Sequence, residues 1–75
     1  MLRYYFDLDD GRILKDADGE LHRDHASALQ AAQRSLAELV EGRSALWTEG
    51  RFEILVSDQE RRRVGRLTVL AETFA

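Results

Sequence analysis

One segment with helical periodicity lies between two pairs of segments in which apolar and polar residues alternate. A period of two places apolar side chains on one face of a strand, whereas a period near 3.6 places them on one face of a helix. The order is therefore β-β-α-β-β. Because 75 residues leave room for one core only, we predict a single small α+β domain over residues 1–75.

The first pair of predicted strands occupies residues 2–8 and 12–15. In the first strand one face carries Leu2, Tyr4, Phe6 and Leu8, and the other carries Arg3, Tyr5 and Asp7. Asp10-Gly11 supplies the positive φ angle that a tight hairpin requires. Residues 16–19 form a second turn, after which residues 20–23 lead toward the helix.

The predicted helix begins after Asp24, whose carboxylate can cap the first turn, although Ser27 is an alternative cap if the helix starts later. Gly42 suits the left-handed residue that ends many helices. The apolar residues at helical spacing are Leu29, Ala32, Leu36, Leu39 and Val40.

The second pair of predicted strands occupies residues 51–57 and about 63–73, with a polar turn between them. Residues 44–50 form a loop that carries Leu46 and Trp47. The buried faces of the two strands carry Phe52, Ile54 and Val56, and Leu67, Val69 and Ala71.

The connections favour one sheet order. A helix that returns the chain over one face places the first strand between the second and the third, which gives a four-stranded antiparallel sheet of order 2-1-3-4. The middle apolar residue of each long element then lies at the centre of the core. These residues are Phe6, Leu36, Ile54 and Val69.

The uncovered face of this sheet is more apolar than a fully solvated face requires. Its apolar residues are Tyr5, Leu55, Leu70 and, beyond the strand, Phe74, among Arg3, Arg51, Glu53, Arg66 and Glu72. On consecutive strands, Tyr5, Leu55 and Leu70 are expected to form one stripe, which a second copy of the chain could bury. Trp47 is either a lid over the core or an interface anchor.

The segment Arg3-Tyr4-Tyr5-Phe6-Asp7, followed by Asp10-Gly11 and an alanine-rich helix, resembles a family of short, uncharacterised alphaproteobacterial proteins known as a domain of unknown function. That resemblance implies the fold and a bacterial origin, and no activity, cofactor or catalytic residue. The order of elements also resembles HicB-like antitoxin domains, an analogy at the level of the fold.

Candidate chemical sites have simpler interpretations. His22 and His25 could share a metal ion, but a third ligand is not evident, so we expect solvated side chains near the helix start. Asp16, Asp18 and Glu20 imitate the opening of a calcium loop, but Ser27 stands where that loop needs a bidentate Glu. Turns also explain Asp9 and Asp10, and Asp7 lies on the solvent face of its strand. So small a domain hardly provides a catalytic pocket. We expect neither catalysis, nor a metal, nor a cofactor.

Arg61, Arg62, Arg63 and Arg66 form the one basic cluster, which could contact phosphates or could be a solvated turn. The net charge of −3 disfavours a nucleic-acid binder. The absence of cysteine excludes disulfides and cysteine-ligated metals. With no apolar segment long enough to span a membrane and no signal-like start, we expect a cytoplasmic protein.

Two hypotheses of function follow. The first is a non-enzymatic protein-interaction module that acts as a homodimer, because association supplies stability that a small core lacks. The second is a nucleic-acid-associated regulator of the HicB-like kind that uses Arg61 to Arg66. Steep loss of affinity with salt distinguishes the second from the first.

Overall fold

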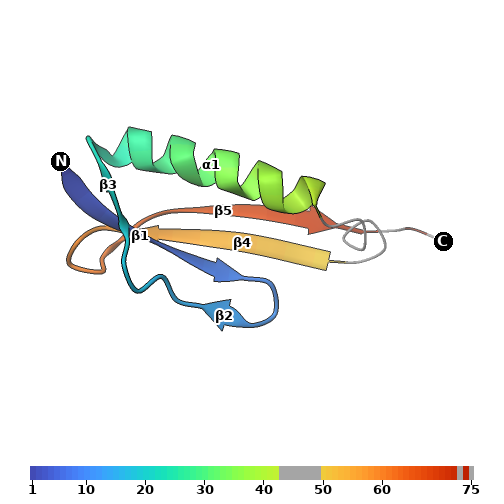
Figure 1. Cartoon of the computed structure of the whole chain (residues 1–75). Coiled ribbons are helices and arrows are strands. Elements are labelled where there is room, and N and C mark those ends of the chain that lie inside the picture. Colours follow the sequence, from blue (N-terminus) through green and yellow to red (C-terminus); the bar gives the residue numbers. More distant parts are fainter. Residues whose placement is uncertain (43–49, 73, 75) are drawn as a thin grey trace.

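The computed structural model describes residues 1–42, 50–72 and 74, in which one helix lies along one face of an antiparallel sheet (Figure 1). The predicted α+β class is confirmed. The elements are β1 (Leu2–Asp9), β2 (Ile13–Leu14), β3 (Glu20–His22), α1 (His25–Glu41), β4 (Gly50–Ser57) and β5 (Arg63–Ala71).

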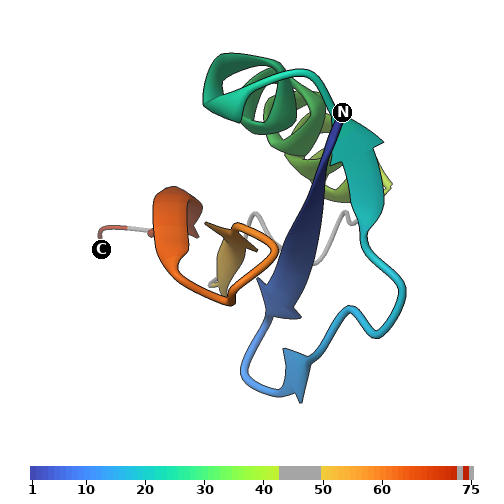
Figure 2. The same ribbon diagram turned by 90° about the vertical axis from the view of Figure 1, so that its left-hand side faces the viewer.

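The sheet order is β2-β1-β4-β5, which confirms the predicted arrangement of the four expected strands. A further strand, β3, pairs with the first half of β1 through Leu2 and His22, Arg3 and Leu21, and Tyr4 and Glu20. The sequence of this segment predicts only a lead into the helix, because three residues are too few to reveal alternation. Figure 2 shows β2 and β3 on one side of β1 and β4 on the other.

The core lies between α1 and the sheet. Leu36 and Ile54, at 6% and 4% exposed, are confirmed as core residues. The prediction that Phe6 and Val69 share its centre is wrong, because both are only partly buried and pack against its margin. The alternation of apolar and polar residues shows which face of a strand is buried, but it does not show how deeply each residue of that face lies beneath the helix. The side chains without any exposed surface include Tyr4, Val56, Ala28 and Ala32.

Gly65 permits close contact between α1 and β5. It lies opposite Val56, on the side of the sheet that α1 covers. A Cβ atom at Gly65 would lie 2.6 Å from Cδ2 of Leu29, so a larger residue would force the Leu29 side chain to move. The absence of a side chain at this position therefore sets how near the helix can approach the sheet edge.

The structure confirms Asp24 as the N-cap of α1 and corrects the predicted conformation at its C-terminal end. The Asp24 carboxylate accepts a hydrogen bond of 2.8 Å from the Ser27 N–H, as an N-cap does. The prediction of a left-handed Gly42 is wrong: its φ is −80°, and its N–H donates to the Glu38 carbonyl at 3.1 Å. The right-handed conformation thus continues through Gly42. Leu46 and Trp47 lie outside the described residues.

Candidate functional site: a charged hollow on the open face

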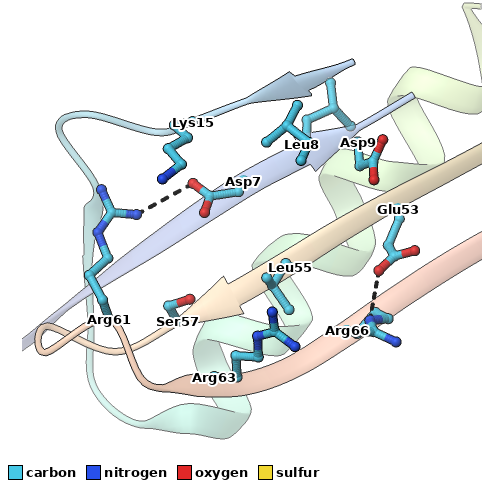
Figure 3. Close-up of a pocket in the computed structure, with 11 residues that line it drawn as sticks. Asp7, Leu8, Asp9, Lys15, Glu53, Leu55, Ser57, Arg61, Arg63 and Arg66 are labelled. Carbon is cyan, nitrogen blue, oxygen red and sulfur yellow. Dashed lines mark hydrogen bonds and ion pairs between the residues drawn. The ribbon is translucent and has the colours of Figure 1, made fainter. Parts of the chain in front are cut away.

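The face of the sheet opposite α1 contains a hollow of about 540 Å³ (Figure 3). The β1–β2 hairpin extends away from the helix (Figures 1 and 2) and contributes residues to this hollow, which we call the open-face hollow. Charged side chains dominate its lining. The lining residues are Asp7, Leu8, Asp9, Ile13, Lys15, Glu53, Leu55, Ser57, Arg61, Arg63 and Arg66.

Glu53 is a buried charge held by two arginines. It is 8% exposed. Arg66 on β5 forms an ion pair between its Nε and Glu53 Oε1 at 2.6 Å, and Arg51 donates to the other carboxylate oxygen. Burial of a carboxylate is tolerated when such charged donors replace water. This ion-pair network joins β4 to β5 across the floor of the hollow.

Arg61 connects the β4–β5 turn to the turn before β3. Its guanidinium donates to the Asp16 carbonyl at 2.9 Å and to Asp7 Oδ1 at 3.5 Å. It also lies 3.7 Å from the centre of the Tyr5 ring, a cation–π contact. Arg61 thus remains 44% exposed, but its guanidinium is held by these contacts and is not a freely solvated side chain. Its φ of 64° is a left-handed conformation that these contacts help to hold.

Asp16 organises the turn that Arg61 contacts. Its carboxylate accepts hydrogen bonds from the backbone N–H groups of Phe6, Asp18 and Gly19 at 3.0–3.2 Å. Burial by itself raises the pKa of Asp16, but these three donors and the charge of Arg61 outweigh burial and lower the pKa below its ordinary value of 3.8. The ionised carboxylate is therefore a structural group that ties β1 to the turn.

We expect Asp16→Asn to lower the free energy of unfolding at pH 7 by about 1–2 kcal/mol, because an amide nitrogen cannot accept the backbone donors. A lowered folded-state pKa gives stability that is present above pH 3.8 and is lost as the pH falls through the lower folded value. Urea unfolding at pH 7 and at successively lower pH measures both effects.

The wild type should lose more stability than Asp16→Asn as the pH falls below about 4. Both proteins retain Asp24, whose pKa is also lowered, chiefly by hydrogen bonds from Ser27, so some acid sensitivity remains in each. Equal pH dependence of the two proteins would contradict this role of Asp16.

The predicted apolar stripe is interrupted by the strand register. Leu55 lies opposite Asp7 on one side and Arg66 on the other, whereas Leu70 lies opposite Arg51 near the far end of β4. Tyr5 lies opposite Ser57 and is covered in part by Arg61. The three apolar residues thus do not form one surface. Leu70 and Phe74 are exposed, at 61% and 88%.

The two histidines lie against the aromatic rings of β1. The Tyr4 hydroxyl and His25 Nδ1 share a hydrogen bond of 2.7 Å, and burial raises the pKa of the Tyr4 phenol. His22 packs edge-on against Tyr4 and Phe6, with ring centres 6.1 and 5.6 Å apart, so the expectation of a solvated side chain is wrong for His22. Within the described residues, no three metal-ligating side chains are grouped to hold a metal ion.

The basic cluster is divided by the structure. Arg61, Arg63 and Arg66 line the open-face hollow, whereas Arg62 pairs with Glu60 at 2.9 Å. Arg61 and Arg66 have carboxylate partners, and Arg63 forms no ion pair with any residue that the structure describes. Lys15, Asp7 and Asp9 also line this site, and no sequence motif predicts them as site residues. The one indication in the sequence was that these polar residues belong to the first hairpin and lie outside the predicted core.

The fold and the open-face hollow define a small α+β domain with one helix-covered and one charged, hollowed sheet face. A family profile described as a domain of unknown function (DUF6894) matches residues 3–71, and the chain belongs to this family. No curated protein and no solved structure matches the chain significantly. In the described part of the chain, α1 lacks the length and apolar character needed to cross a membrane.

Proposed function

We propose that the chain is a protein-interaction module that forms a homodimer by pairing the β5 edges of two copies. The observation that carries this proposal is the contrast between the two edges of the sheet. Beyond β1, the edge is divided between β2 and β3, of two and three residues. Beyond β4, it is the nine-residue β5, which among the described strands pairs with β4 alone.

The sequence of β5 favours association. Residues 67–71 read Leu-Thr-Val-Leu-Ala, a β-prone run without charge or proline. Natural sheets usually block an exposed edge with charges, proline or a bulge, because its free N–H and C=O groups recruit another strand. The Leu70 side chain is 61% exposed, and Val69 is only partly covered by α1. This half of β5 is therefore a surface for strand addition.

A second copy of the chain fits this edge. If two β5 strands pair antiparallel about a twofold axis at Val69, Arg66 of one copy lies opposite Glu72 of the other, and Thr68 lies opposite Leu70. Opposite charges then meet at both ends of the uncharged segment. Burial of a leucine contributes roughly 1.5–3 kcal/mol, which supports association together with the backbone hydrogen bonds.

We expect Leu70→Lys to convert the dimer to a folded monomer, because two lysines would lie near the axis while the monomer already exposes this position. Sedimentation of the wild type and the variant over a hundredfold concentration range measures the change. Ile13→Lys is the matched control, since Ile13 is 66% exposed on β2 at the opposite edge. A wild type that remains monomeric throughout, or equal effects of the two substitutions, would overturn the proposal.

Leu55→Lys distinguishes edge pairing from the face-to-face dimer that sequence analysis predicted. Leu55 lines the open-face hollow and lies opposite Arg66 on β5, whereas Leu70 lies opposite Arg51, further along β4. Edge pairing predicts that Leu55→Lys remains dimeric, whereas stacking of the open faces would place this lysine in the interface. Dissociation of Leu55→Lys with retention of the Leu70→Lys dimer would favour the stacked arrangement.

A further inference from the structure

We propose that the open-face hollow binds a small phosphate monoester. The site lies on the open face of the sheet, and it shares Arg66 with the proposed β5 interface but none of residues 67–71. It is defined by cationic side chains that converge on one hollow from different elements, with Lys15 following β2, Arg61 in the β4–β5 turn, and Arg63 and Arg66 on β5 (Figure 3).

The hollow is positive within an acidic chain. Four cationic and three carboxylate side chains line it, which gives the lining a formal charge of +1. Because the whole chain carries −3, the remaining residues carry −4. An anion is therefore attracted to this hollow and repelled by the rest of the surface.

Two of the four cationic side chains that line the hollow have no ion-pair partner among the described residues. Asp7 pairs with Arg61, and Glu53 pairs with Arg66, so these carboxylates hold their arginines in place. Lys15 and Arg63 form no ion pair with any described residue. Figure 3 shows Lys15 beside β1 and Arg63 beside Leu55, on different sides of the hollow. An anion between them would gain two charge-assisted contacts without breaking an existing ion pair.

The chemistry of these side chains suits a dianion. A guanidinium can bind two phosphate oxygens in a bidentate manner, and an ammonium adds a compact second charge. Ser57 lines the floor of the hollow and carries a hydroxyl group that can donate to a phosphate oxygen. The Asp9 Oδ1 atom accepts a hydrogen bond of 3.1 Å from the Gly11 N–H. This hydrogen bond directs that oxygen toward the hairpin turn.

Size and charge favour a small ligand over a nucleic-acid strand. A volume of about 540 Å³ lies in the range of about 300–1,000 Å³ that small-molecule sites occupy. A polyanionic strand would have to extend beyond the hollow over a surface whose formal charge is −4, and Arg62 at its margin is already paired with Glu60. A nucleoside monophosphate has the charge and size that the site can accept.

The test is a titration of the full chain, observed by backbone amide chemical shifts, with three probes at one ionic strength. These are a nucleoside monophosphate, inorganic phosphate, and a single-stranded oligonucleotide without a terminal phosphate. We expect saturable binding of the monophosphate, with shifts centred on Ser57, Arg63 and Lys15. Inorganic phosphate should bind the same residues more weakly, because it fills less of the hollow.

Arg63→Ala and Lys15→Ala should each weaken monophosphate binding about tenfold, whereas Arg62→Ala, which removes a neighbouring arginine outside the hollow, should leave it unchanged. Leu70→Lys should bind as the wild type does, since the proposal does not require a dimer. Failure of the monophosphate to saturate, equal losses in the Arg62 and Arg63 variants, or tighter binding of the oligonucleotide would each overturn the proposal. The last result would instead assign the nucleic-acid function.

Discussion

Tyr4→Ala is expected to remove most of the stability of the domain, so that the variant unfolds at a much lower temperature and urea concentration than the wild type. The Tyr4 side chain has no exposed surface and lies in the core cluster with residues of α1 and β4. Truncation of a buried aromatic side chain generally costs about 3–5 kcal/mol. A small domain has a total stability near the lower end of about 5–15 kcal/mol, so this loss removes most of it. Circular dichroism during thermal and urea unfolding measures the effect.

Tyr4→Phe is the matched control. This variant keeps the ring and its contacts with His22 and His25, and removes only the hydroxyl that is hydrogen-bonded to His25. It should fold with a modestly lower unfolding midpoint, because loss of one hydrogen bond costs about 1 kcal/mol in general. A Tyr4→Ala protein that melts with the wild type would show that the assigned core is incorrect.

Ile54→Lys is expected to prevent folding. Ile54 is 4% exposed and lies between Leu8 and Leu67 on the helix-covered face of the sheet. A lysine at this position would have to bury its charge without a partner or displace α1, and either alternative costs more than a small domain can lose. The far-ultraviolet circular dichroism spectrum and amide proton dispersion should be those of an unfolded chain.

The control for this substitution is one residue away. Leu55 lies on the opposite face, where Leu55→Lys places its ammonium in the open-face hollow beside solvent. Leu55→Lys should therefore remain folded. If Ile54→Lys folds and Leu55→Lys does not, the assignment of the two faces of β4 is reversed.

Much of the fold followed from patterns that act locally. The alternation around Phe52, Ile54 and Val56 predicted the buried face of β4, and Asp24 predicted the helix start. The sheet order followed from the direction of each connection rather than from any one residue. These features depend on neighbours in the sequence, and a single chain contains that information.

Other features depend on distant residues and were missed. β3 exists because Leu21 and His22 can pair with the first residues of β1, and three residues carry too short a pattern to predict this. The depth of Tyr4 depends on where α1 crosses the sheet. The separation of Leu55 from Leu70 depends on the register of β4 against β5, which periodicity does not determine.

The candidate site was predicted only in part. The sequence shows the arginines at 61, 63 and 66 but not that two of them are neutralised by Asp7 and Glu53. Arg61 adopts a positive φ and crosses to the turn at Asp16, a contact between residues 45 positions apart. The β1–β2 hairpin, which contributes Ile13 to the lining of the hollow, projects away from α1, and local patterns do not specify this position.

Residue-resolved hydrogen exchange along β5 tests most directly whether two copies pair through this edge. In a monomer, β4 protects alternate amides of β5, and the others face solvent. In the proposed dimer, both sets are hydrogen-bonded, so consecutive amides over residues 67–71 should all be protected at concentrations where the wild type associates. Leu70→Lys should restore the alternating pattern. Alternating protection in the wild type at high concentration would contradict pairing of the β5 edges.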